Sequence, residues 1–144
     1  MNETDVVIGN RDTHALIVST WSHLGARRLT LPRLYYHRLV VAEPSLPLIY
    51  SEADMQDHSH RFVELMEALV AGQLAGDELT SLGRDFQRSG FQTEQVEQFI
   101  DVLLTSIAGL HGVAWSAPLE AAWINLLGRA GQVIQRSARR RLFA

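Results

Sequence analysis

Apolar residues recur at helical spacing along almost the whole of this chain, and proline or glycine interrupts each run. After Asp12 or Thr13, either of which is a plausible N-cap, apolar side chains recur mainly three or four positions apart until Gly25. A strand would require alternation with a period of two, and only short apolar runs leave room for it. The pattern therefore predicts an all-α protein.

Six further segments carry helical signals. Thr30 before Leu31 and Pro32 predicts the start of a second helix, which ends at Glu43 and Pro44. The later segments are a short turn over 48–50, a long helix over about 56–71, a short helix over 77–89, a helix with Thr93 as N-cap that ends between Gly109 and Gly112, and a last helix that opens at 116–118. Residues 51–54 are expected to form a polar connection.

The composition removes several classes of chemistry. The chain contains no cysteine, which excludes thiol catalysis, thiolate-bound zinc and iron–sulfur clusters. All 13 basic residues are arginine, so Schiff-base and P-loop lysine chemistry are excluded as well. The net charge of −3 argues against an extended nucleic-acid-binding surface. The basic residues that do cluster lie at the C-terminus: Arg136, Arg139, Arg140 and Arg141.

The chain is expected to form one domain. A length of 144 residues is typical of a single domain, and no internal repeat or long linker divides it. We therefore assign residues 1–144 to one unit. No basic leader and no long apolar stretch is present, so we expect a cytoplasmic protein with no membrane partner.

Four groups of residues are informative through their order and spacing. They are Trp21 in the first helix, the run 34–39 with Glu43, Pro44 and Tyr50, the pair Leu82 and Gly83 followed by Gly90 and Phe91, and the run 120–123 in the last helix. In this order they resemble the globin family over about residues 14–136. The resemblance implies a globin-like fold of about six to eight helices.

The resemblance also implies where a ligand pocket would lie. Tyr36 matches the distal tyrosine with which many bacterial globins hydrogen-bond iron-bound dioxygen. Tyr50 matches the aromatic residue, normally phenylalanine, that packs on the porphyrin. The position on the distal helix falls on His60 or Arg61, because the preceding connection aligns only with a gap.

The proximal side departs from the family pattern. Globins carry Leu-Gly-x-x-His in the proximal helix, and in this sequence Phe86 stands where the histidine would be. A benzyl side chain has no lone pair with which to bind iron. The tyrosine that polarises the proximal histidine in flavohaemoglobin-like globins is also missing, since Val96 stands at that position. We therefore expect no cofactor and a pocket filled by aromatic side chains: Tyr35, Tyr36, Tyr50, Phe62, Phe86 and Phe99.

The histidines give little support to a metal site or an active site. His58 and His60 are two residues apart on a helix and point in different directions, so they cannot jointly bind one metal ion. Each of them remains a candidate for binding haem alone from the distal side. The others are His14, His23, His37 and His111, which are expected on the surface without a catalytic role. No nucleophile motif or phosphate loop is present, and we predict that the protein is not an enzyme.

Three functional hypotheses follow from the resemblance. The leading one is a haemless globin-like domain that acts as a sensory, regulatory or protein-interaction module, by analogy with the non-haem globin domains of some bacterial stress regulators. Its partner would be another protein or a second copy bound through the last two helices, and we do not expect nucleic acid as a partner. The second is a haem-binding globin with His60 or His58 as ligand, which binds or senses dioxygen or nitric oxide. The third is a carrier of another apolar ligand.

Overall fold

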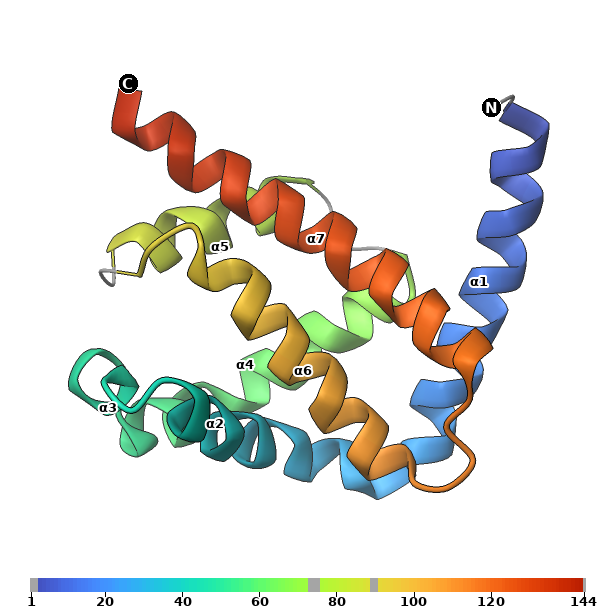
Figure 1. Cartoon of the computed structure of the whole chain (residues 1–144), viewed down its shortest axis with the longest axis horizontal. Coiled ribbons are helices and arrows are strands. Elements are labelled where there is room, and N and C mark those ends of the chain that lie inside the picture. The colour runs from blue at the N-terminus through green and yellow to red at the C-terminus, as the bar shows by residue number, and fades with distance from the viewer. Residues whose placement is uncertain (1–2, 73–75, 89–90, 144) are drawn as a thin grey trace.

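The computed structural model describes residues 3–72, 76–88 and 91–143, and this part of the chain contains helices and connections but no strand. The helices in order are α1 (Glu3–Leu24), the 3-10 helix η1 (Gly25–Thr30), α2 (Leu31–Ala42), α3 (Leu46–Ile49), α4 (Glu52–Val70), α5 (Gly76–Arg88), α6 (Gln95–His111) and α7 (Ala117–Phe143) (Figure 1). The all-α prediction is confirmed.

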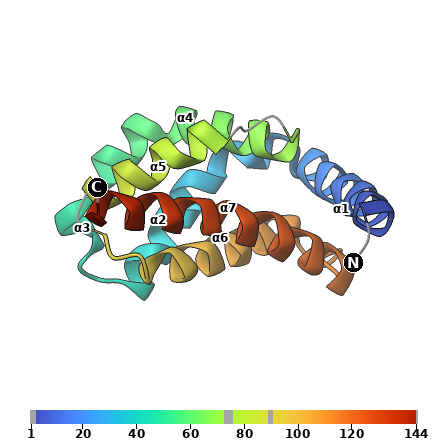
Figure 2. The same cartoon turned by 90° about the horizontal axis from the view of Figure 1, so that it is seen from above.

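Helix α7 organises the packing. It extends from the neighbourhood of α1 along both α5 and α6 (Figure 1). Seen from above, α4 and α5 lie on one side of α7 and α6 lies on the other (Figure 2). Helix α2 packs against both α4 and α6. No helix within the described ranges combines the length and the low polarity needed to cross a bilayer.

The larger core cluster lies where α1, α4, α6 and α7 meet. Ile107 and Trp123 are fully buried there, and the rings of Trp21 and Trp123 lie 6.4 Å apart. The apolar side chains of α6 and α7 recur four positions apart, as in Leu103 with Ile107 and Trp123 with Leu127. This spacing places them on one face of each helix, so both helices bury a continuous stripe.

A second cluster lies around the connection from α2 to α4. Its buried members are Tyr36, Leu39, Leu46 and Met55, and partly buried side chains packed against it are Tyr35, Val40, Tyr50, Phe91, Phe99 and Val102. This cluster contains both tyrosines that were singled out as pocket residues from the sequence.

Several expected helix boundaries were wrong. Helix α1 begins at Glu3, well before Asp12. The expected polar connection over 51–54 is the first turn of α4, because Ser51 and Asp54 form a reciprocal capping box. Helix α6 begins at Gln95 with Glu94 as N-cap, so Thr93 does not cap it.

Candidate functional site

Tyr36 is held inside the protein by a hydrogen bond of its own. Its side chain lies in α2 and only 4% of the residue is exposed. The hydroxyl donates to the backbone carbonyl of Tyr50 over 2.8 Å. Burial, followed by the charges of Glu52 and Asp54, raises the pKa of Tyr36, so the hydroxyl keeps its proton and remains a donor. The group that the resemblance assigned to an iron-bound ligand therefore connects α2 to the end of α3.

Tyr35 links three helices next to this position. Its hydroxyl donates to the backbone carbonyl of Phe99 in α6 over 3.0 Å, and its ring lies 5.6 Å from that of Phe62 in α4. Burial raises the pKa of Tyr35 above its usual range. Both adjacent tyrosine hydroxyls of α2 thus donate to main-chain carbonyls. Phe62 and Phe99 were both expected to help fill the pocket. Phe62 packs its ring near that of Tyr35, and the backbone carbonyl of Phe99 accepts the Tyr35 hydroxyl.

Tyr50 lies between a tyrosine and a histidine. Its ring is 6.4 Å from the ring of Tyr36 and 6.2 Å from the ring of His58. The Tyr50 hydroxyl donates to the Asp54 carbonyl over a longer distance of 3.3 Å. His58 is therefore the α4 histidine whose ring lies against this aromatic pair.

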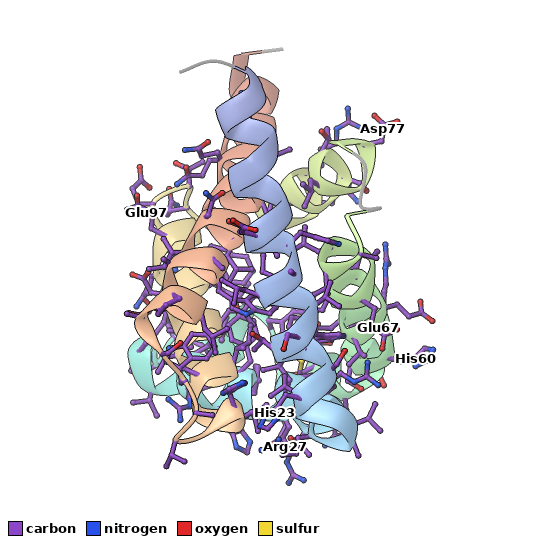
Figure 3. All side chains as sticks on the ribbon, turned by 90° about the vertical axis from the view of Figure 1, so that its right-hand side faces the viewer. His23, Arg27, His60, Glu67, Asp77 and Glu97 are labelled. Atoms are coloured by element: carbon purple, nitrogen blue, oxygen red, sulfur yellow. The ribbon has the colours of Figure 1, made fainter. Side chains whose placement is uncertain are left out.

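His60 and Arg61 both face solvent. The His60 side chain is 87% exposed, and its Nε2 lies 2.8 Å from the Glu64 carboxylate on the next turn of α4. Figure 3 shows His60 on the outside of α4, near Glu67. Arg61 is exposed as well. Neither of the two residues assigned to the distal helix position points into the interior.

The inward face of α4 is defined by a different set of residues, namely Met55, Val63, Met66 and Val70. These positions repeat at helical spacing, so positions 60 and 61 fall outside the stripe that they define. The stripe was present in the sequence. It could have settled the orientation of α4, which the resemblance left open because of the gap before the helix.

Of the two positions assigned to the proximal side, the structure describes the side chain at position 96 but not the one at position 86. Phe86 belongs to α5, and its side chain lies outside the described residues. Val96 is buried in the first turn of α6 and packs against Gly131 of α7. If residue 131 carried a side chain, its Cβ would lie only 3.3 Å from Cγ1 of Ile100 and 3.5 Å from Cγ1 of Val96. Glycine at this position therefore allows α6 and α7 to approach closely.

The residue at the proposed proximal position does not fit haem iron. The resemblance assigns the iron ligand to position 86, where the chain carries phenylalanine, and phenylalanine supplies no electron pair. Two histidine rings lie beside the aromatic pair: that of His58 is 6.2 Å from the ring of Tyr50, and that of His37 is 6.3 Å from the ring of Tyr36. Within the described residues, no three histidine, aspartate or glutamate side chains gather closely enough to hold a metal ion.

The remaining histidines divide into two groups. His14, His23 and His37 are exposed, as expected. His111 is buried, so the expectation that it lies on the surface was wrong. Helix α6 ends at residue 111, between Gly109 and Gly112 as expected, but this residue lies on the inward face of the helix with Ile107 one turn before it.

Comparisons with known proteins agree with this architecture. No protein-family model matches the chain. The neuroglobin of Dissostichus mawsoni is 25% identical over 128 residues, which is 77% of this chain and 80% of that protein. A crystal structure from Pseudomonas aeruginosa PAO1, described as structurally highly homologous to a human hemoglobin, superposes with a TM-score of 0.73 at 19% identity and covers 88% of this chain and 98% of that one.

The structural match concerns the fold, and the neuroglobin match concerns the sequence. The helices match that bacterial structure over most of both chains, although few residues are identical. The neuroglobin similarity extends over most of the chain and supports a relationship to globins at the level of sequence. The chain therefore has the globin-like fold that its helix pattern resembled, and it is similar in sequence to a neuroglobin.

Proposed function

We propose that this protein is a haemless globin that acts as a sensory or regulatory module through contact with another protein or with a second copy of itself. The observation that carries the proposal is the residue at position 86. A phenylalanine in α5 offers no donor atom where a globin binds iron. Imidazole ligation from this side is therefore ruled out by the chemistry of the residue.

The distal side supports the same conclusion. The Tyr36 hydroxyl, which would stabilise an iron-bound ligand in the family, donates to the Tyr50 carbonyl. Freeing it for a ligand would leave that carbonyl without this donor in a buried cluster, which costs free energy. The Tyr36 hydroxyl therefore has a structural role, which supports a protein without haem.

The surface formed by α6 and α7 supports the interaction role. A groove between these helices is lined in part by the apolar side chains of Ile100, Leu104 and Ile124, and Ile124 is 53% exposed. Polar residues along the groove include Glu97 and Gln132. A mixture of apolar and polar side chains is usual in interfaces between proteins that also exist apart. We assign the homodimer contact to this surface.

A haem titration tests the cofactor. The wild type, expressed with haem supplied, should show no stoichiometric Soret band, because α5 contains no histidine and Phe86 has no donor atom for the iron. The matched variant Phe86→His returns an imidazole to that position, and a Soret band in this variant alone would show that Phe86 is what prevents binding. A stoichiometric band in the wild type would overturn the proposal.

Light scattering tests the surface. A homodimer should have twice the mass of the chain, and Ile124→Glu should reduce it to the monomer by placing a charge on the apolar face. Val113→Glu is the control, since Val113 is fully exposed outside the groove. A wild type that stays monomeric at every concentration would refute the homodimer, and the contact would then have to be with a different protein.

The second candidate function is haem binding from the distal side by His60 or His58, both of which are exposed on α4. The His58 ring lies 6.2 Å from that of Tyr50, whereas the His60 imidazole pairs with Glu64 in solvent. If the wild type binds haem, the Soret band should disappear in His58→Ala and persist in His60→Ala. Native mass spectrometry of the purified protein tests the third hypothesis, an apolar ligand, because a retained ligand adds mass to the folded chain.

A further inference from the structure

His111 is a buried imidazole at the last turn of α6. Only 7% of the residue is exposed, and its Nδ1 has no hydrogen-bond partner. Its ring lies 4.5 Å from the ring of His23 at the end of α1 and 5.7 Å from the ring of Trp115 in the connection to α7. Two histidines from distant parts of the chain are thus in ring contact where α1 meets α6.

Arg27 joins the same helix ends through the main chain. Its guanidinium donates to the carbonyl of Leu110 in α6 over 2.6 Å and to the carbonyls of His23 and Leu24 over 2.9 and 3.2 Å. Figure 3 shows His23 and Arg27 together at this end of the molecule. A permanent positive charge is therefore fixed beside His111.

The groups around His111 offer no compensating negative charge. Helix α1 contributes His23 and η1 contributes Arg27, and from α2 the Arg38 guanidinium approaches the backbone of Gly109. The connection over 112–116 contains no titratable side chain. Glu120 in the first turn of α7 is exposed, and no carboxylate in the described ranges pairs with His111.

Protonation of His111 is unfavourable in this setting. Burial lowers the pKa of His111, and the neighbouring His23 and Arg27 lower it further. The carbonyl end of α6 would attract a cation, but Arg27 already donates to the Leu110 carbonyl there. The folded protein therefore holds this imidazole in its neutral form.

We propose that the His23–His111 pair is a proton-sensitive joint, which holds the end of α6 against α1 and η1 at neutral pH and loosens in acid. Protonation places a charge in a buried position beside His23 and Arg27, and separating the helix ends relieves it. Trp115, which is only partly exposed and whose ring packs against that of His111, then becomes more accessible. This inference is independent of haem binding and of the proposed dimer.

The sign of the effect follows from linkage. The unfolded chain binds the proton near the ordinary histidine pKa of 6.5, and the folded chain binds it only at a lower pH. Stability is therefore unaffected by this group above pH 6.5 and falls as the pH drops from there toward the folded pKa. If the folded imidazole is still neutral at pH 5.5, the unfolding constant rises about tenfold from this group alone.

Urea unfolding at pH 7.5 and 5.5 tests the joint. For each protein we compare the unfolding constant at pH 5.5 with that at pH 7.5. The increase on going to pH 5.5 should be up to about tenfold larger in the wild type than in His111→Gln, because the glutamine side chain does not take up a proton. His14→Gln is the matched control, since His14 is exposed on α1 and should keep the wild-type ratio. Equal ratios in the wild type and His111→Gln would overturn the proposal.

Two measurements on folded protein keep the test decisive if His111→Gln does not fold. The NMR titration midpoint of the His111 imidazole should lie below the ordinary histidine value of about 6.5 and should rise in His23→Gln. Amide exchange over 108–115, corrected for its intrinsic pH dependence, should quicken at pH 5.5 more than exchange in the middle of α6. A His111 midpoint at or above the ordinary histidine value of about 6.5, or uniform exchange, would refute the joint.

Discussion

Removing the hydroxyl of Tyr36 separates a structural tyrosine from a ligand-binding one. In Tyr36→Phe the ring remains in the buried cluster with Leu39, Leu46 and Met55, and only the hydrogen bond of 2.8 Å to the Tyr50 carbonyl is lost. A protein hydrogen bond contributes about 0.5–1.5 kcal/mol, and a buried acceptor left without its donor costs about 1–3 kcal/mol. We expect a loss of about 1–2 kcal/mol, which lowers the melting temperature of a domain of this size by roughly 3–8 °C.

The matched control is Tyr50→Phe. Its hydroxyl donates over 3.3 Å to the Asp54 carbonyl from a ring that is only partly buried, so the loss should stay below about 0.5 kcal/mol. Urea unfolding followed by helical circular dichroism measures both variants against the wild type. The slope of the free energy against urea should not change, because neither variant alters the surface exposed on unfolding.

Two results would refute this reasoning. A Tyr36→Phe protein as stable as the wild type would mean that the hydroxyl contributes nothing to the fold and is free to serve a ligand. A loss in Tyr50→Phe equal to that in Tyr36→Phe would mean that any hydroxyl in this region has the same effect. The contact between Tyr36 and the Tyr50 carbonyl would then have no special role.

Two further predictions concern stability. Ile107→Ala should cost about 2–5 kcal/mol, because its side chain is fully buried in the larger core cluster, whereas Val113→Ala at a fully exposed position should stay within about 0.5 kcal/mol in the same urea assay. Ser51→Ala should cost about 1 kcal/mol by removing the N-cap of α4, measured at pH 7. Hydrogen bonds from Ser51 lower the pKa of Asp54, so the contribution of Asp54 to the cap is complete above its ordinary pKa near 3.9 and is lost as the pH falls through the lowered value. The difference between the wild type and Ser51→Ala should therefore shrink in strong acid, and a constant difference would contradict the capping box.

The helices could be predicted from the sequence, because helix formation depends largely on residues that are close together in the chain. Spacing of apolar side chains and the placement of proline and glycine located the helices, and the ends of α2 and α6 lie where those signals put them. The start of α4 was missed, although Ser51 and Asp54 carried a capping-box spacing. The inference from Phe86 also rests on the sequence alone, because a phenylalanine side chain has no donor atom in any structure.

Tertiary structure decided which way side chains face and what they meet. The rotation of α4 about its axis turns His60 and Arg61 to solvent and brings His58 to Tyr50, and this rotation is fixed by the inward stripe that packs on neighbouring helices. The contact of His111 with His23 joins residues far apart in the chain. Local periodicity places a residue on a helix, but burial and long-range hydrogen bonds exist only once several helices have packed together.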